Sequence, residues 1–484
     1  MMTESDSSLY RHPLSERYAS EEMQRIFASS RRYGIWRRLW LALASSQLDL
    51  GLSISPEGLE EMEKKLDNID LSKAAEYEQR FRHDVMAHVH LFGDDAPKAR
   101  SFIHLGATSA FITDNTDLIL HKEALELIRD RVIRCISALS AFAKVYRDVP
   151  TMGFTHFQPA QPTTVGKRAT LWIQDFLLDL EEIEFRLSTI KLRGAKGTTG
   201  TQASFLQLFD GDHTKVESLD KAVAEKMGFE KSFAVTGQTY PRKVDAQILG
   251  SLANLATSTS KMGHDLRLLA NLQEVEEPFE KEQIGSSAMP YKRNPMRSER
   301  ICGMSRHVIT LVQNPLFTAA TQWLERSLDD SVNRRLSIPD AFLTMDGILV
   351  LLENVASGLK VNRSVIDRNL QEHLPFMASE TILMAAVANG GDRQELHERI
   401  RKHSMEASKR MKEEGAPLDL LERIAGDQFF DLDLEQLKNI VDPAKFIGRS
   451  DRQVDQFLQE SVQPHLDRLE KIARKRLSNP NIRV

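Results

Sequence analysis

The middle of the chain carries apolar residues at alternating steps of three and four positions. The pattern extends over residues 125–142, 173–190 and 248–269, and it returns over 301–311 and 342–352. This spacing is typical of helices that pack side by side along narrow apolar stripes. Alternation with a period of two is scarce, so we expect no series of β-strands. The pattern predicts five long helices in an elongated bundle.

The pattern divides the chain into three parts. Residues 1–108 predict a smaller domain of shorter helices, residues 109–361 the long-helix bundle, and residues 362–484 a second small domain of charged helices. Pro315 is expected to kink or end a bundle helix. The expected fold class is therefore all-α, with an elongated central bundle flanked by two smaller helical domains. Helices longer than about 25 residues exceed the usual globular range, and such bundles often continue across subunits, so we expect an oligomer.

Composition narrows the class of protein. The chain is 41% hydrophobic and 27% charged, as globular proteins are, and its net charge of −5 gives no support for non-specific nucleic-acid binding. No stretch approaches about 18 uncharged apolar residues, and no cationic region precedes an apolar run, so we expect neither a membrane span nor a secretory signal. Two cysteines, Cys135 and Cys302, form no disulfide framework, which favours a reducing, cytoplasmic setting.

Four polar segments interrupt the apolar pattern, and the first is Arg82-His83-Asp84 with His88 and His90 behind it. His83 and Asp84 could supply a base and the carboxylate that orients it. Histidines two positions apart suit a metal site on a strand, but we expect a helix here and predict no metal. A solvated or helix-capping role is the alternative for each histidine.

The second segment combines Gly106 with the hydroxyls of Thr108 and Ser109. At the start of a helix, such residues present hydroxyl and backbone N–H groups to a carboxylate or phosphate. The alternative is an ordinary helix cap further on, at Thr113 or Asp114.

The third segment spans residues 153–162 and holds His156. Pro162 is expected to begin the second long helix, because proline is preferred at the first helical position. His156 would then lie in a loop at the end of a bundle helix, where a general acid or base is well placed. A structural role is the equal alternative for a lone histidine.

The fourth segment, residues 285–300, is the most informative. Two adjacent hydroxyls, Ser286 and Ser287, lie near its start. Glycine and proline interrupt regular structure at Gly285, Pro290 and Pro295. Four cations follow the serines, namely Lys292, Arg293, Arg297 and Arg300. A flexible loop of this kind suits closure over an anionic substrate. No serine-hydrolase elbow, P-loop or dinucleotide-binding glycine pattern occurs in the sequence.

Together the four segments resemble the fumarase/aspartase superfamily, and within it the adenylosuccinate lyase family in its eukaryotic form. The resemblance rests on residues 285–295, 82–84, 106–109, 155–161 and 236–239. The first stretch is the superfamily's mobile-loop motif, which is highly specific. The resemblance implies anti β-elimination of fumarate, which converts adenylosuccinate to AMP and the succinylated carboxamide ribotide SAICAR to AICAR. It implies no metal and no organic cofactor.

The resemblance also implies a role for each matching residue. Ser286 is the expected general base and His156 the general acid, while Lys292 and Asn294 face the succinyl carboxylates. Glu299 resembles the carboxylate that orients the His156 imidazole. Because serine is a very weak acid, nearby cations and N–H groups must stabilise its alkoxide. Chemistry alone does not choose between the two adjacent serines, and the resemblance favours the first.

His83 is expected to assist on the phosphate and leaving-group side. The remaining expected substrate contacts are Arg17, Tyr18, Arg82, Asp84, Thr108, Ser109, Gln238, Arg300, Arg326, Ser331 and Arg335, whose arginines offer forked donors to anions. The superfamily assembles each site from three subunits of a homotetramer. The expected partners are therefore succinylated purine nucleotides and copies of this chain, with no nucleic acid and no membrane. The alternatives are another fumarate-releasing lyase, such as argininosuccinate lyase, and a non-catalytic, crystallin-like relative.

Overall fold

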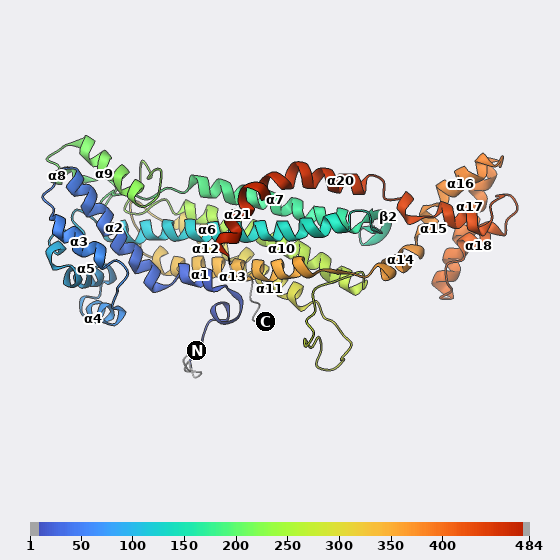
Figure 1. Ribbon diagram of the computed structural model, residues 1–484, viewed down its shortest axis with the longest axis horizontal. Helices are drawn as coiled ribbons and strands as arrows, with labels where there is room; N and C mark the ends of the chain where they lie inside the picture. Colours follow the sequence, from blue (N-terminus) through green and yellow to red (C-terminus); the bar gives the residue numbers. More distant parts are fainter. Residues whose placement is uncertain (1–8, 478–484) are drawn as a thin grey trace.

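The computed structural model describes residues 9–477 and shows an elongated helical molecule (Figure 1). Its middle is a bundle of long helices that pack along one another. These helices are α6 (Ser109–Val145), α7 (Val165–Thr189), α10 (Lys243–Asn271), α11 (Met296–Leu311) and α13 (Asp330–Gly358). The predicted all-α class and the elongated central bundle are confirmed.

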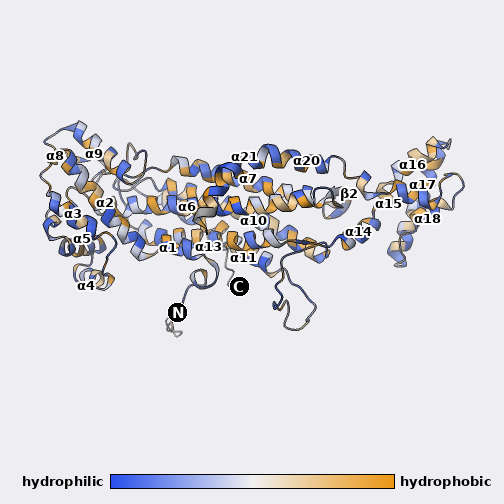
Figure 2. Cartoon of the chain, viewed as in Figure 1, coloured by the Kyte–Doolittle hydropathy of each residue, from blue (hydrophilic) through white to orange (hydrophobic). Residues whose placement is uncertain are grey.

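The apolar stripes of the sequence form the core of this bundle. Ile128, Ile173 and Leu252 are fully buried, as are most of the other stripe residues. Apolar residues are concentrated along the bundle helices (Figure 2). The longest helix, α6, has 37 residues and spans about 55 Å at 1.5 Å per residue. It therefore joins the two ends of the bundle.

The expected break at Pro315 is confirmed. Helix α11 ends at Leu311, and α12 (Gln313–Thr321) starts a new helix with Pro315 in its first turn. A proline lacks the backbone N–H and clashes with the preceding turn, so it is favoured in the first turn of a helix and disfavoured further along, although α13 holds Pro339 in its interior.

A β-hairpin lies between α6 and α7, and the pattern of the sequence did not predict it. Strand β1 (Pro150–Thr155) pairs antiparallel with β2 (Gln158–Thr164). His156 and Phe157 form the turn, and both have a positive φ, of 52° and 55°. This left-handed geometry is typical of two-residue hairpin turns. His156 therefore occupies the tip of a hairpin.

The hairpin also makes the prediction for Pro162 wrong. Pro162 lies within β2, and α7 begins three residues later at Val165. The true N-cap is Thr164, whose hydroxyl oxygen accepts the Lys167 N–H at 3.0 Å. A two-stranded ribbon tolerates proline because each strand keeps one unpaired edge.

The N-terminal helices share a second core with two helices that follow α7. Trp40 and Phe92 are buried in it together with Phe205 of α8. The elements of this end are η1 (Leu14–Tyr18), α1 (Glu21–Ile26), α2 (Ser29–Asp49), α3 (Pro56–Lys64), α4 (Leu71–Phe81), α5 (Asp84–Asp95), η2 (Pro97–Ala99), α8 (Ala203–Leu208) and α9 (His213–Lys226). His88 and His90 lie on α5, which confirms the helix expected there.

The helices after the bundle form a third core at the opposite end, which includes Leu396, Ile424 and Phe430. The last two helices return along the bundle and pack on α6 and α7 (Figure 1). The elements are β3 (Val275–Glu276), β4 (Lys360–Val361), α14 (Arg363–Gln371), α15 (Leu374–Met377), α16 (Ser379–Ala388), α17 (Arg393–Glu413), α18 (Leu420–Ala425), α19 (Leu434–Ile440), η3 (Pro443–Lys445), α20 (Ser450–Phe457), η4 (Leu458–Val462) and α21 (Gln463–Arg476). Within residues 9–477, no helix has the length and apolar character needed to span a bilayer.

Candidate active site

A cavity of about 1440 Å³ opens where the N-terminal helices meet one end of the bundle. Its walls come from the α4–α5 junction, the start of α6, the segment before α10 and the start of α13. Nine of the residues singled out from the sequence line it together: Arg82, His83, Asp84, Thr108, Ser109, Gln238, Arg326, Ser331 and Arg335. Segments distant in sequence thus converge on one polar cavity, as a ligand site requires.

His83 is held at the mouth of this cavity by its own helix. It is the N-cap of α5, and its Nδ1 accepts the Met86 N–H at 3.3 Å. The ring proton of the neutral imidazole therefore lies on Nε2. Asp84 lies 3.7 Å from His83 Nδ1, which is too far for a hydrogen bond, and it accepts instead from Arg335 at 3.3 Å. Asp84 orients Arg335 and does not orient His83.

The start of α6 presents polar groups to the cavity. Thr108 is the N-cap of α6 but makes no side-chain capping bond, so its hydroxyl is not used by the helix. The first N–H groups of a helix have no partner within it and attract anions. The alternative cap at Thr113 or Asp114 is wrong, since both residues lie inside α6. This helix start can bind a carboxylate or phosphate.

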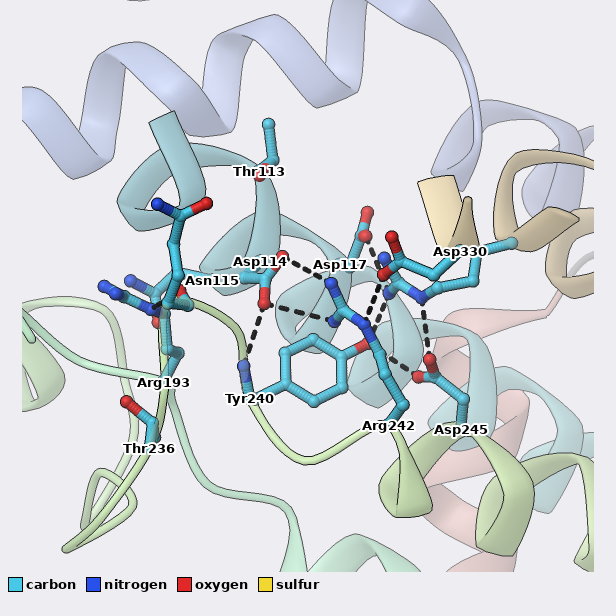
Figure 3. Close-up of polar contacts among 12 residues, drawn as sticks. Thr113, Asp114, Asn115, Asp117, Arg193, Thr236, Tyr240, Arg242, Asp245 and Asp330 are labelled. Carbon is cyan, nitrogen blue, oxygen red and sulfur yellow. Dashed lines mark hydrogen bonds and ion pairs between the residues drawn. The ribbon is translucent and has the colours of Figure 1, made fainter. Parts of the chain in front are cut away.

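The cavity wall contains a largely buried charge network that the sequence did not reveal (Figure 3). Asp114 accepts two bonds from Arg242, each of 3.1 Å, and one from the Tyr240 N–H at 2.9 Å. Arg242 also donates to Asp330 at 2.6 Å. Although burial opposes its charge, the carboxylate of Asp114, helped by Tyr240 and Asp245, keeps the pKa of Arg242 above the ordinary arginine value. The network joins the start of α6 to the starts of α10 and α13.

A second arginine extends this network. Arg334 donates to Asp245 at 2.7 Å and to Asp117 at 2.9 Å, and the Tyr240 hydroxyl donates to Asp245 at 2.6 Å. Burial alone would raise the pKa of both carboxyls, but Arg334 together with the neighbouring cations and hydrogen-bond donors outweighs burial and holds each pKa below its usual range. The one hint in the sequence was the polar run 113–117 inside an otherwise apolar helix pattern.

The segment 277–295 has no regular structure and projects from the bundle between β3 and α11 (Figure 1). It carries Ser286, which is half-buried, and Ser287, which is exposed. Ser286 Oγ accepts N–H bonds from Met289 at 3.2 Å and from Ala288 at 3.4 Å. Donors of this kind stabilise a developing alkoxide. Asn294 closes the neck of the segment by donating to the Gly285 carbonyl at 2.8 Å.

The four cations of residues 285–300 do not all face solvent. Arg297 is only 3% exposed and donates to the carbonyl of Pro278 and to Asn354, so its charge is not available to an anionic substrate. Arg293 lies 3.4 Å from Glu276. Among the described residues, Lys292 and Arg300 have no ion-pair partner, so their charges remain available.

Several expected site residues lie away from the cavity within this chain. The hairpin that carries His156 follows the far end of α6, about 55 Å from Thr108. Glu299 is exposed in the first turn of α11. Arg17 and Tyr18 belong to η1, which packs on α13, and do not line the cavity. One chain therefore presents the expected site residues in separate groups.

Comparison with known proteins identifies the family. Residues 57–310 match the family described as lyase, and residues 375–457 match the one described as adenylosuccinate lyase C-terminus. Adenylosuccinate lyase of Saccharomyces cerevisiae is 51% identical over 96% of this chain and 97% of that protein. Adenylosuccinate lyase of Schistosoma mansoni is 48% identical over 94% of this chain and 95% of that protein. The crystal structure of 3-carboxy-cis,cis-muconate lactonizing enzyme from Pseudomonas putida shares the fold, with a TM-score of 0.79 at 22% sequence identity. The match covers 93% of this chain and 99% of that one. The chain therefore belongs to the adenylosuccinate lyase family, a family of lyases within the fumarase/aspartase superfamily.

Proposed function

We propose that the chain eliminates fumarate from adenylosuccinate to give AMP and from SAICAR to give AICAR, in purine biosynthesis. The reaction removes a proton from the carbon next to a carboxylate and breaks a carbon–nitrogen bond. It needs a base, an acid for the leaving nitrogen, and fixed donors where negative charge develops. The single observation that carries the proposal is Ser286, whose Oγ already accepts two loop N–H bonds in the superfamily's loop motif.

The cavity supplies the anion-binding part of this proposal. Arg82, Arg326 and Arg335 line it together with the start of α6, which suits the phosphate of a nucleotide. The proposed base is Ser286 and the proposed acid His156, with Lys292 and the side chain of Asn294 on the succinyl carboxylates. Substrate would have to break the bond from Asn294 to Gly285 to use that amide.

We propose that each site draws on several copies of the chain in a homotetramer. His156 lies about 55 Å from Thr108 along α6, so both can touch one substrate only if they come from different chains. Helix α7 supports such an assembly, because Leu171, Leu178 and Phe185 are 51%, 58% and 53% exposed at steps of seven. A stripe of this kind is a helix-packing face. Free, buried Cys135 and Cys302 support a cytoplasmic setting.

Fumarate release from adenylosuccinate, SAICAR and argininosuccinate tests the reaction. We expect turnover of the first two, and turnover of argininosuccinate alone would refute the proposal. Ser286→Ala should abolish turnover with substrate binding retained, whereas Ser287→Ala should keep most of kcat. Near-normal kcat in Ser286→Ala would remove the base assignment.

Subunit mixing tests the shared sites. Inactive Ser286→Ala and His156→Ala tetramers should regain part of the activity after exchange, because some sites then combine two intact groups. Absence of recovery after exchange has been verified by mass spectrometry would contradict sites built from several chains.

A further inference from the structure

The two ends of the segment 277–295 are tied together by a polar cluster around the buried Arg297 and Ser298, outside the proposed catalytic groups. We call this cluster the loop clasp. It consists of Glu277, Glu280, Arg297, Ser298 and Asn354.

Glu277 forms the first half of the loop clasp. One of its carboxylate oxygens accepts the Arg297 N–H at 3.0 Å, and the other accepts the Ser298 N–H at 3.0 Å and the Ser298 hydroxyl at 3.1 Å. These N–H groups belong to the first turn of α11, whose N-cap residue, Pro295, supplies no side-chain cap. The Glu277 carboxylate, at the start of the loop, thus caps the N-terminus of α11, which follows the end of the loop. A negative charge is favourable at a helix N-terminus.

Arg297 forms the second half. Its guanidinium is buried and donates to the Pro278 carbonyl at 2.9 Å and to Asn354 of α13 at 2.8 Å, and it also pairs with Glu280. Planar, multiply bonded guanidinium groups fix geometry more firmly than a single contact does. The start of the loop is therefore bound to α11 and α13 at once.

Close packing reinforces this attachment. Pro278 lies so near Gly358, at the end of α13, that a Cβ added to Gly358 would be 2.6 Å from Pro278 Cβ. The bases of the loop and of the bundle helices are thereby in contact, while Ser286 and the exposed residues after it project beyond the loop clasp.

We propose that the loop clasp is a positioning device that sets where Ser286 is delivered, with Glu277 and Arg297 as positioning residues. This inference rests on the proposed function, in which Ser286 takes the substrate proton. Reacting groups must approach within a narrow range of distance, and a displacement of about 1 Å lowers the rate about 100-fold. Fixing both ends of the loop limits the positions that Ser286 can occupy.

The test is Glu277→Gln in the full-length protein, since glutamine removes the charge and turns an N–H donor toward the helix N–H groups. We expect kcat to fall about 10- to 100-fold and KM to change much less, because the arginines of the cavity still bind the substrate while Lys292 and Asn294 of the loosened loop contact it less often. Trypsin cleavage after Lys281 and Lys292 should become about tenfold faster, since the tethered loop opens more often. Glu413→Gln, on an exposed face of α17, is the matched control and should behave as wild type.

Asn354→Leu is the second variant, because it removes one acceptor of Arg297 at similar volume and keeps the loop sequence intact. It should reproduce the fall in kcat and the faster cleavage. Wild-type kcat in both variants, or a lower kcat with an unchanged cleavage rate, would overturn the loop clasp. If the wild-type protein released no fumarate, the proposed function would fail, and the trypsin rates would still decide whether the loop clasp holds the loop.

Discussion

Replacing Arg242 by methionine should destabilise the folded chain far more than removal of a surface arginine. The Arg242 side chain is about 1% exposed, and the carboxylates of Asp114 and Asp330 that it contacts are each about 2% exposed. Methionine keeps the apolar stem and removes the guanidinium. Two buried carboxylates then lose their principal partner, and solvent cannot reach either of them.

The expected loss of folding free energy depends on the contacts that Asp114 and Asp330 keep in the variant. Breaking a buried ion pair costs about 3–5 kcal/mol. Asp114 keeps the Tyr240 N–H at 2.9 Å, and Asp330 keeps Arg326 at 3.9 Å. Because these contacts compensate in part, we expect the lower end, about 3 kcal/mol, which is about a hundredfold in the unfolding equilibrium constant.

Urea unfolding followed by circular dichroism at one protein concentration measures this loss. The control is Arg25→Met, whose partner is Glu21 and whose side chain is 77% exposed, so its effect should stay within about 0.5 kcal/mol. The double variant Asp114→Asn with Arg242→Met should recover part of the loss, because one unpaired charge is removed as well. A loss below about 1 kcal/mol for Arg242→Met would refute the reasoning.

Three further predictions concern other parts of the molecule. Burial lowers the pKa of His88 from 6.5 to about 4, so the unfolded state binds the proton more readily and stability falls as pH drops below 6.5. His88→Phe should remove about 1.4 kcal/mol per pH unit of that slope between pH 6.5 and 4 in urea titrations, and an unchanged slope would contradict it. Gly166→Ala should cost about 2–3 kcal/mol in the same assay, because the new Cβ would lie 2.3 Å from the Ala143 carbonyl; no loss would mean that the helices can separate. Leu178→Glu should dissociate the oligomer in sedimentation experiments, and an unchanged mass would exclude this face of α7 from the interface.

The sequence predicted the bundle because the bundle depends on local periodicity. Stripe residues such as Ile128 and Ile173 repeat every three or four positions, and burying them together accounts for the side-by-side packing of the helices. The break before α12 was equally local, since proline favours the first turn of a new helix over the interior of a continuing one. Features that depend on a few neighbouring residues can be derived from one chain.

The hairpin was missed for an equally physical reason. It is a two-stranded ribbon with much exposed surface, so it leaves no regular alternation of apolar residues to detect. Pro162 favours a helix start and also fits the free edge of a ribbon strand. Thr164, only two residues later, was the better capping residue, and only the observed N–H bond separates the two possibilities.

Some features of the candidate site could likewise be predicted from the sequence, and others could not. Motifs revealed Ser286 and the cavity residues because their types are unusual where they stand. Arg242 pairs with Asp114, 128 residues before it, and with Asp330, 88 residues after it. No local sequence pattern contains pairs this far apart. Arg297 was counted among the four loop cations by its charge alone, and its burial against Pro278 could not be inferred from sequence.

The length of the bundle helices is the reason why the proposed site needs more than one chain. Helices α6, α10 and α13 run between the end that holds the cavity and the end that holds the hairpin and the base of the loop. At 1.5 Å per residue even α13, with 29 residues, separates the two by about 43 Å. A loop cannot close that distance, whereas a neighbouring chain packed antiparallel along the exposed stripe of α7 would bring its far end beside the cavity. In the proposed mechanism the packing of subunits is thus a step in building the site, and the loop clasp gains its importance because Ser286 must reach a substrate held by another chain.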